Sequence, residues 1–382
     1  MNSKYEELNK KIVEWIKKGS QDSLILQTLY SQCNLEHHEM LEGAEDLRAN
    51  TKFATLNNQQ LVACFSPYFF NEYSKEDLNH LMQEVHNRYI GENGWEVSRQ
   101  VYVGYGDDDE DENTFGYCCY ADDLLFINKG MIDEAKTIEN EQVALNAQTV
   151  GKYFLDTVWH ETKHIIQYED SIDLALGKEQ DPETAFSAAA MIVMMTNFNI
   201  AESRADDRYL DKWQDMYRFH FCEHEANYAA LKRSELNTPE ALKQTYDYQM
   251  YASDSAALAL GFYPSTTNNS KNLSDAGARV NRIEGYLQSQ IAYFKKGTKD
   301  CPLKETVLST LNEYMKYDEN GHSQFRDKLR SEVLEMIDTY VINKSKVEMM
   351  DNQMQDEQEK GKTLVLKPKS RKILNNEEGF AK

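Results

Sequence analysis

Two histidines stand four residues apart in the stretch TVWHETKHIIQYED, residues 157–170, and a glutamate directly follows the first. If the stretch is helical, His160 and His164 lie one turn apart and about 40° apart around the axis. Two imidazoles so placed can bind one tetrahedral metal ion, and Glu161 can reach a metal-bound water. The metal lowers the pKa of that water, and a carboxylate can accept its proton during attack on a carbonyl. The spacing therefore predicts a metal-dependent hydrolytic site.

The element that must carry these residues is predicted to be a helix over 149–168. One stripe of this helix, on the side away from the histidines, is mostly apolar. Its members are Leu155, Val158, Trp159, Thr162, Ile165 and Ile166. We expect this stripe to pack into the core, so that the histidines face another part of the molecule.

A metal site of this kind needs a third protein ligand and an open fourth position. The stretch FCEHEANYAAL, residues 221–231, offers Glu223, with Asn227 one turn later as a hydrogen-bond partner for a ligand histidine. Small side chains would let this helix pack closely against another, namely Ala226, Ala229 and Ala230. The stretch ESRADD offers Glu202 instead, and Glu225 is a third choice.

Hydrolysis of a peptide bond also needs a hydrogen-bond donor for the oxyanion, commonly a Tyr or His near the metal. Several such side chains stand close to the motifs, namely Tyr168, Tyr217, His220, His224 and Tyr228. Of these, His220 and Tyr228 are the predicted catalytic donors.

These motifs resemble those of the zincin peptidases that combine a His-Glu-x-x-His helix with a downstream glutamate ligand, the gluzincin type. The run EHEANYAAL is similar to the Glu-x-Glu-Ala-Asn-x-x-Ala pattern of the small bacterial members, the minigluzincin type, which include the phage-repressor-cleaving group. The stretch YCCYADDLLFIN, residues 117–128, resembles the edge strand that lies beside the peptide substrate in such folds. The resemblance covers about residues 95–235.

The resemblance implies a zinc metalloendopeptidase in which His160, His164 and Glu223 bind Zn²⁺ and Glu161 is the general base. The substrate would be a protein or peptide, and a bacterial or phage origin would suit the family, with an injected effector or a regulatory protease as two versions. The longer match around Glu223 favours it over Glu202. The long gap between His164 and Glu223 departs from the minimal pattern and predicts an inserted helix over about 182–200.

The whole chain predicts a predominantly α (α+β) fold, with a zincin-like core, a small β-sheet and flanking helical regions. We expect an N-terminal helical region at 1–94, the metallopeptidase core at 95–240, a C-terminal helical region at 241–350 and a mobile polar tail at 351–382. A break rich in Ser, Thr and Asn is expected at 263–275. Strand-like segments on both sides of the acidic run DDDEDEN predict a hairpin with this run as its tip.

Composition narrows the classes of protein. The chain of 382 residues has a formal net charge of −22 and no domain-sized basic patch, so we do not expect nucleic-acid binding. The most apolar run, AFSAAAMIVMM, is shorter than the roughly 20 residues that span a bilayer, and we see no secretory signal. The six cysteines form no CxxC pair. We expect a cytoplasmic protein without a membrane partner; leaderless export and the oligomeric state stay open.

Other functions also fit parts of the pattern. A non-catalytic helical interaction or scaffold protein, with a structural or vestigial metal site, would need neither Glu223 nor Glu202 near the histidines. Another metal-dependent hydrolase, such as an amidase, could use the same residues. The acidic run at 107–113 could bind calcium, although its spacing does not match an EF-hand loop.

Overall fold

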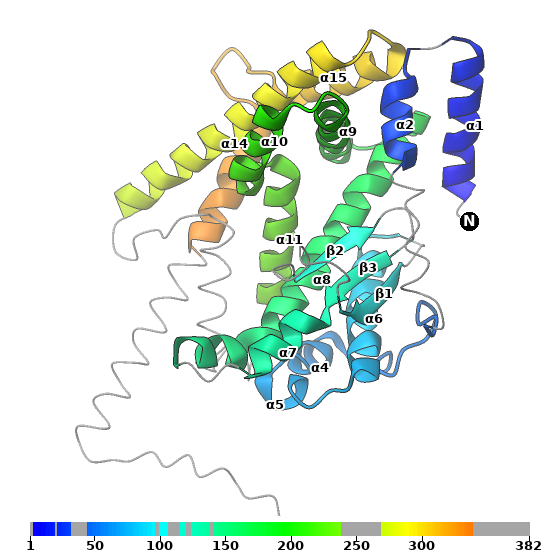
Figure 1. Cartoon of the computed structure of the whole chain (residues 1–382). Helices are drawn as coiled ribbons and strands as arrows, with labels where there is room; N and C mark the ends of the chain where they lie inside the picture. Colours follow the sequence, from blue (N-terminus) through cyan, green and yellow to red (C-terminus); the bar gives the residue numbers. More distant parts are fainter. Residues whose placement is uncertain are drawn as a thin grey trace, which may run out of the picture.

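The computed structural model describes residues 3–19, 21–31, 44–95, 99–105, 115–119, 124–137, 141–237 and 269–338. Over these residues the protein is predominantly helical with one three-stranded sheet, which confirms the predicted balance of helix and strand. Figure 1 shows the long helix α8 (Glu141–Leu176) passing through the molecule, with the sheet on one side and α11 (Phe221–Asn237) on the other.

Short helices come first along the chain. They are α1 (Ser3–Lys17), α2 (Ser23–Ser31), α4 (Asn58–Ala63), α5 (Pro67–Phe70) and the longer α6 (Lys75–Glu92). The side chain of Ser74 accepts a hydrogen bond from the backbone N–H of Asp77, which satisfies one amide in the first turn of α6.

The mixed sheet has the strand order β1–β3–β2, with β1 at Gln100–Gly104, β2 at Gly116–Cys119 and β3 at Leu124–Asn128. The central strand β3 pairs in parallel with β1 and antiparallel with β2. Every residue of β3 is buried, whereas β2 is mostly half-buried, as expected for an edge strand. Because β1 and β2 are not neighbours, the predicted hairpin is wrong. The acidic run at 107–113 lies outside the described residues.

Helix α8, which follows α7 (Lys129–Thr137), contributes to two hydrophobic clusters. Its apolar stripe is buried as predicted, and packs with α4–α6 and the sheet in the first cluster. From Tyr168 onward it belongs to a second cluster, which includes side chains of α1, α2 and α9. The turn that carries the two histidines therefore lies beside the junction of the two clusters.

Helix α9 (Pro182–Ser203) fills the interior of the second cluster, where a helix over 182–200 was predicted. Asp181 caps it by accepting hydrogen bonds from the N–H groups of Glu183 and Thr184. The helix is long and apolar enough to span a membrane, but 72% of its most apolar window is buried inside the protein. That burial is typical of the core helix of a soluble protein. Two short elements, α10 (Asp207–Met216) and the 3₁₀ turn η2 (Tyr217–Phe219), lead from α9 to α11.

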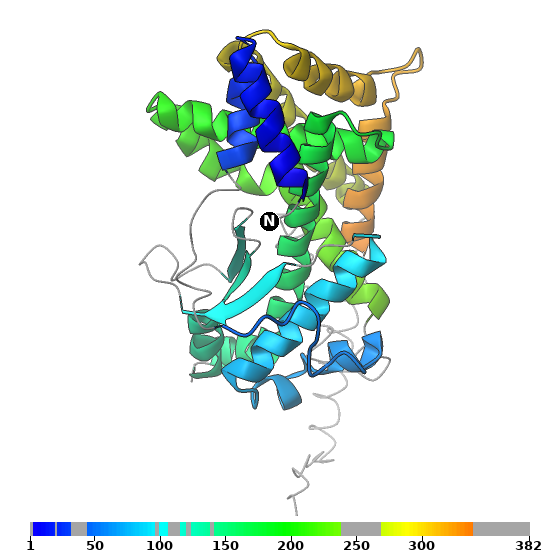
Figure 2. The same cartoon turned by 90° about the vertical axis from the view of Figure 1, so that its right-hand side faces the viewer.

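The C-terminal helices pack on α9 as well. They are α14 (Asn269–Gly297), α15 (Pro302–Met315) and the helical residues 324–338. Phe186 of α9 stacks on Tyr314, with ring centroids 4.6 Å apart, and also contacts Phe325. Figure 2 shows α1 and α2 at the same end of the molecule as α14 and α15.

The structure bears on the predicted break at 263–275 and on the domain boundaries expected at 94 and 240. The predicted break at 263–275 is wrong in its second half, because α14 already begins at Asn269. The second hydrophobic cluster also joins residues from both sides of the expected boundaries at 94 and 240. That division into domains stays a prediction, and the tail at 351–382 lies outside the described residues.

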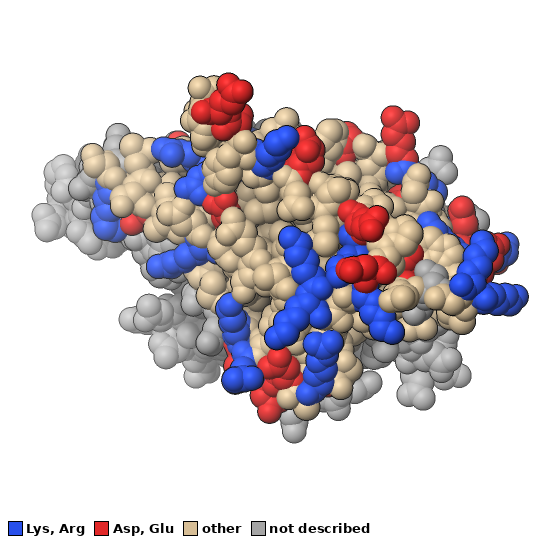
Figure 3. Space-filling view, turned by 90° about the horizontal axis from the view of Figure 1, so that it is seen from above, with Lys and Arg blue, Asp and Glu red and all other residues tan. Residues whose placement is uncertain are grey.

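The end of the molecule formed by α14 and α15 carries many basic side chains. Figure 3 shows Lys and Arg interleaved with Asp and Glu on this face, although the formal net charge of the chain is −22.

Candidate metal centre

His160, His164 and Glu223 come together where α8 meets α11. The Nε2 atoms of the two histidines are 3.0 Å apart. The carboxylate oxygens of Glu223 lie 3.3 Å from Nε2 of His160 and 3.1 Å from Nε2 of His164. Ligands of a tetrahedral zinc ion, at bond lengths of about 2.0–2.1 Å, lie about 3.3 Å from each other. The two imidazole nitrogens and the carboxylate therefore fit one face of a zinc tetrahedron.

The local sequence explains how α11 positions Glu223. The helix begins at Phe221, so Glu223 lies in its first turn, where the helix dipole favours a negative charge. Ala226 and Ala230 follow on the same face and are buried, which allows α11 to pack against α8. The close approach expected from the small side chains is thus present.

The charges of the ligand residues suit a cation. Burial raises the pKa of the Glu223 carboxyl, but the adjacent histidines outweigh it and hold this pKa well below its ordinary value. Burial lowers the pKa of His164, but Glu223 outweighs it and raises this pKa to about 9. The space between these side chains therefore stabilises positive charge.

Glu161 reaches the same space from α8 without joining the ligand group. Its Oε1 is 4.0 Å from Nε2 of His160. The thiol of Cys118, in the edge strand β2, lies close to its carboxylate. Burial raises the pKa of Glu161, and the two histidines oppose that rise. A carboxylate in this position is available to accept a proton.

A buried hydrogen-bond chain holds the histidine turn in place. The backbone N–H of Arg99 donates to Nε2 of His86 at 2.9 Å, so Nδ1 of His86 carries the proton. Nδ1 then donates to the hydroxyl of Thr162 at 2.8 Å, and this hydroxyl donates to the carbonyl of Val158. Burial lowers the pKa of His86 to about 3, so the ring is neutral and this pattern is stable at ordinary pH. The turn between the two ligand histidines is thereby fixed to α6 and to the start of the sheet.

The alternative ligands predicted from the sequence lie elsewhere. Glu202 is exposed near the end of α9 and is not part of the three-residue group. Glu225 is buried but accepts hydrogen bonds from Gln167 and Lys328. The ring nitrogen Nδ1 of His164 faces Oε1 of Gln167 at 2.8 Å, in the role predicted for Asn227. Of the three candidate carboxylates, only Glu223 is brought to the histidines.

The two predicted oxyanion donors also have other partners. His220 accepts a hydrogen bond from the N–H of Cys222 at Nδ1 and donates from Nε2 to Gln290 at 2.9 Å. Burial lowers its pKa to about 4, so it is neutral. The hydroxyl of Tyr228 donates to Glu335 at 2.7 Å. These contacts direct neither side chain to the space beside the ligands.

His224 and Tyr168, the other flanking residues, are engaged in the core. His224 lies 3.0 Å from a carboxylate oxygen of Glu332. The hydroxyl of Tyr168 donates to the carbonyl of Leu29 in α2. Both contacts are structural and join helices that are distant in sequence.

Tyr217 is the flanking residue that does reach the metal centre. Its hydroxyl lies close to the carboxylates of Glu223 and Glu161, while 47% of the residue is exposed. Burial of the hydroxyl, with these two carboxylates, raises its pKa well above the ordinary value. The group is therefore a neutral donor at the edge of the site. The sequence marked Tyr217 only by its position six residues before Glu223.

Comparisons with known proteins add no relative. No protein-family model, no curated protein and no solved structure matches the chain.

Proposed function

We propose that the protein is a zinc-dependent metallopeptidase with a zincin-like core. The observation that carries this proposal is the group formed by His160, His164 and Glu223, whose ligand atoms all lie within 4.8 Å of one another. Glu161 stands beside the group, and the edge strand β2 packs against α8 with Cys118 close to Glu161. A helix with two histidines, a second helix with a glutamate and an adjacent sheet edge are the parts that such a peptidase needs.

The residues of the chain would divide the chemistry among them. Zinc held by the three ligands supplies a water of lowered pKa and polarises the carbonyl of the substrate. Glu161 accepts a proton from the attacking water and passes it to the leaving amine. The hydroxyl of Tyr217 donates a hydrogen bond to the carbonyl oxygen as negative charge develops there. Burial of Glu161 favours its protonated form, which helps it to hold that proton between the two steps.

The sheet edge favours an extended peptide as substrate. An extended chain can add to an edge strand through backbone hydrogen bonds. β2 is the edge strand nearest α8 in the described sheet, and Cys118 in β2 lies close to Glu161. A peptide paired with β2 would therefore bring its carbonyl groups to the catalytic glutamate. A small amide substrate would make no use of this edge.

The first test is zinc content by elemental analysis of the purified full chain. The expected result is about one zinc per chain, as for a single catalytic site. Glu223→Ala should lose it, and Glu202→Ala, its matched control, should keep it. If the wild type holds no zinc after incubation with the metal, the proposal fails.

The second test separates catalysis from metal binding. Glu161→Gln should keep its zinc and lose cleavage of unfolded protein substrates by about 10²–10⁴-fold, because the amide cannot accept the proton. If the wild type holds zinc but cleaves no peptide library member, the scaffold role with a structural metal replaces the peptidase.

A further inference from the structure

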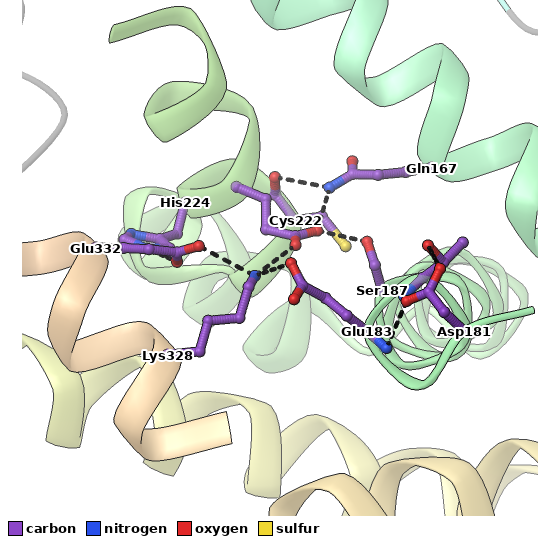
Figure 4. A network of polar contacts seen from close by, with 10 residues as sticks. Gln167, Asp181, Glu183, Ser187, Cys222, His224, Lys328 and Glu332 are labelled. Carbon is purple, nitrogen blue, oxygen red and sulfur yellow. Dashed lines mark hydrogen bonds and ion pairs between the residues drawn. The ribbon is translucent and has the colours of Figure 1, made fainter. Parts of the chain in front are cut away.

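A chain of polar contacts leads from the candidate ligand His164 to the C-terminal helix. It passes from His164 through Gln167 and Glu225 to Lys328. Figure 4 shows Gln167 projecting from α8 on one side of this network and Lys328 from the C-terminal helix on the other. The last member of the chain is thus 164 residues beyond the ligand in sequence.

Gln167 fixes the tautomer of His164. The side-chain amide N–H of Gln167 donates to the carboxylate of Glu225 at 3.0 Å and to the carbonyl of Cys222 at 3.2 Å. Because both acceptors lie on the amide side, Oε1 must face His164, and Nδ1 of His164 must donate to it. In the neutral ring that binds a metal, the lone pair of His164 is then on Nε2, which faces His160 and Glu223. This is the tautomer that a metal ligand requires.

Glu225 keeps Gln167 in that orientation, and Lys328 keeps Glu225 buried. The glutamate is 6% exposed and also accepts a hydrogen bond from Ser187 of α9. The Nζ of Lys328 lies 3.0 Å from Oε1 of Glu225. A carboxylate buried without its cation is strongly unfavourable. Without the ammonium group, Glu225 would turn towards solvent and leave Gln167.

Lys328 is itself held by a set of carboxylates. Besides Glu225, it pairs with Glu183 at 3.3 Å and with Glu332 at 3.1 Å. Burial lowers its pKa, but these three carboxylates outweigh burial and raise it. The side chain, 17% exposed, therefore stays charged and in place.

We propose that Gln167, Glu225 and Lys328 are positioning residues for the zinc ligand His164, and that the helical residues 324–338 are thereby part of the metal centre. This inference rests on the proposed function, since it presumes zinc at the three ligands. Partners that orient a ligand histidine typically change metal affinity by about 10–100-fold when they are removed.

The chain offers a matched control for Lys328. Lys232 of α11 pairs with Glu335, so it joins the same two helices through a more exposed ion pair. Glu335 also accepts from Tyr228, but nothing in this pair contacts Gln167. Loss of Lys232 therefore tests the effect of weaker helix packing alone.

The test measures the dissociation constant for Zn²⁺ of the full chain by competition with a chromophoric chelator. Lys328→Met and Gln167→Met should each weaken binding about 10–100-fold. The double variant should bind no more weakly than Gln167→Met, because both changes break one chain. Lys328→Arg should restore most of the affinity, and Lys232→Met should change it less than about threefold, as for an exposed ion pair.

Thermal unfolding of the metal-free variants separates positioning from stability. If Lys328 has a purely structural role, Lys328→Met lowers the unfolding temperature without weakening zinc binding. Alternatively, the losses of zinc affinity caused by Lys328→Met and Gln167→Met add in the double variant. Either result overturns the inference while the zinc site stands, whereas a wild type that binds no zinc removes both proposals. If Lys328→Met does not fold, Lys328→Gln and Gln167→Met decide the matter in the same way.

Discussion

Tyr217 approaches the metal centre from the 3₁₀ turn that precedes α11. Its hydroxyl lies close to Glu223, and its raised pKa keeps the proton on the oxygen. Loss of a preorganised donor to the oxyanion costs about 10²–10³-fold in kcat. We expect Tyr217→Phe to show a loss of this size, with zinc content and KM little changed, in an assay of peptide cleavage.

Tyr228→Phe is the matched control for this prediction. Its hydroxyl donates to Glu335 rather than to a group at the metal centre, so kcat should be nearly that of the wild type. Equal losses in the two variants would mean that Tyr217 acts only through packing.

Cys118 provides a chemical probe of the space beside Glu161. Of the described cysteines, Cys118 and Cys64 are half-buried and the others are buried. Because the thiol of Cys118 lies close to Glu161, a maleimide attached there should block the site and abolish most of the peptidase activity. Cys118→Ser should stay active after the same treatment, whereas Cys64→Ser should be inhibited like the wild type. Inhibition of Cys118→Ser would place the sensitive thiol elsewhere.

Among single residues, those whose placement depends on one helix could be predicted from the sequence. The close approach of the two histidines and the burial of the apolar stripe agree with the sequence because both depend only on helical periodicity. Tyr217, Gln167 and Cys118 were not assigned a role, since their positions at the site depend on how η2, α8 and β2 meet. Local pattern also could not show that His220 and Tyr228 find partners on α14 and the C-terminal helix.

Helix α8 carries a buried titratable carboxyl group at Asp170. Burial raises its pKa to about 7, against the opposing effect of Lys163 and Lys4 and with a further rise from Asp173 and Glu225. The folded state therefore binds a proton that the unfolded chain, with an ordinary Asp pKa of about 3.9, releases at lower pH. The resulting stabilisation is complete below about pH 4 and is lost as the pH rises to about 7.

Asp170→Asn should consequently become more stable relative to the wild type as the pH rises. We expect the difference in the free energy of unfolding to grow between pH 4 and pH 7 by up to about 1.4 kcal/mol per pH unit, and to level off above pH 7. Urea unfolding at pH 4.5, 6 and 8 measures it. A difference that is constant across these pH values would show that burial does not raise the pKa of Asp170.

Among the elements, long helices were predicted better than strands. The helix over 182–200 and its Asp181 cap follow from composition and capping chemistry, and both are present. The order β1–β3–β2 could not be read from the chain, because two strand-like runs separated by a polar segment are equally compatible with a hairpin and with a crossover. The edge position of β2, on which the substrate proposal depends, is therefore a result of the structure.

The whole molecule is organised around two hydrophobic clusters that share α8. The sequence indicated a central unit with helical additions, since composition and punctuation change near residue 95. Contacts between distant segments also join the N-terminal helices to this central unit. Tyr5 of α1 donates to Glu169 of α8 at 2.6 Å, and Lys4 pairs with the same glutamate at 2.9 Å. The N-terminal helix is thus tied to the helix that carries the metal ligands.

The fragment 95–240 tests whether the flanking helices are additions or parts of the core. In the full chain, α9 is covered by α2, α14 and α15, so the fragment would expose apolar side chains such as Phe186 and Met191. Each large apolar side chain left in water costs about 1.5–3 kcal/mol, and a domain has only about 5–15 kcal/mol of stability. We expect the fragment to bind a hydrophobic dye, to lack a cooperative thermal transition and to hold no zinc, whereas the full chain does the opposite in each measurement. A fragment that unfolds cooperatively and binds zinc as tightly as the full chain would show that the second cluster is dispensable, and with it the contribution of Lys328 to the metal centre.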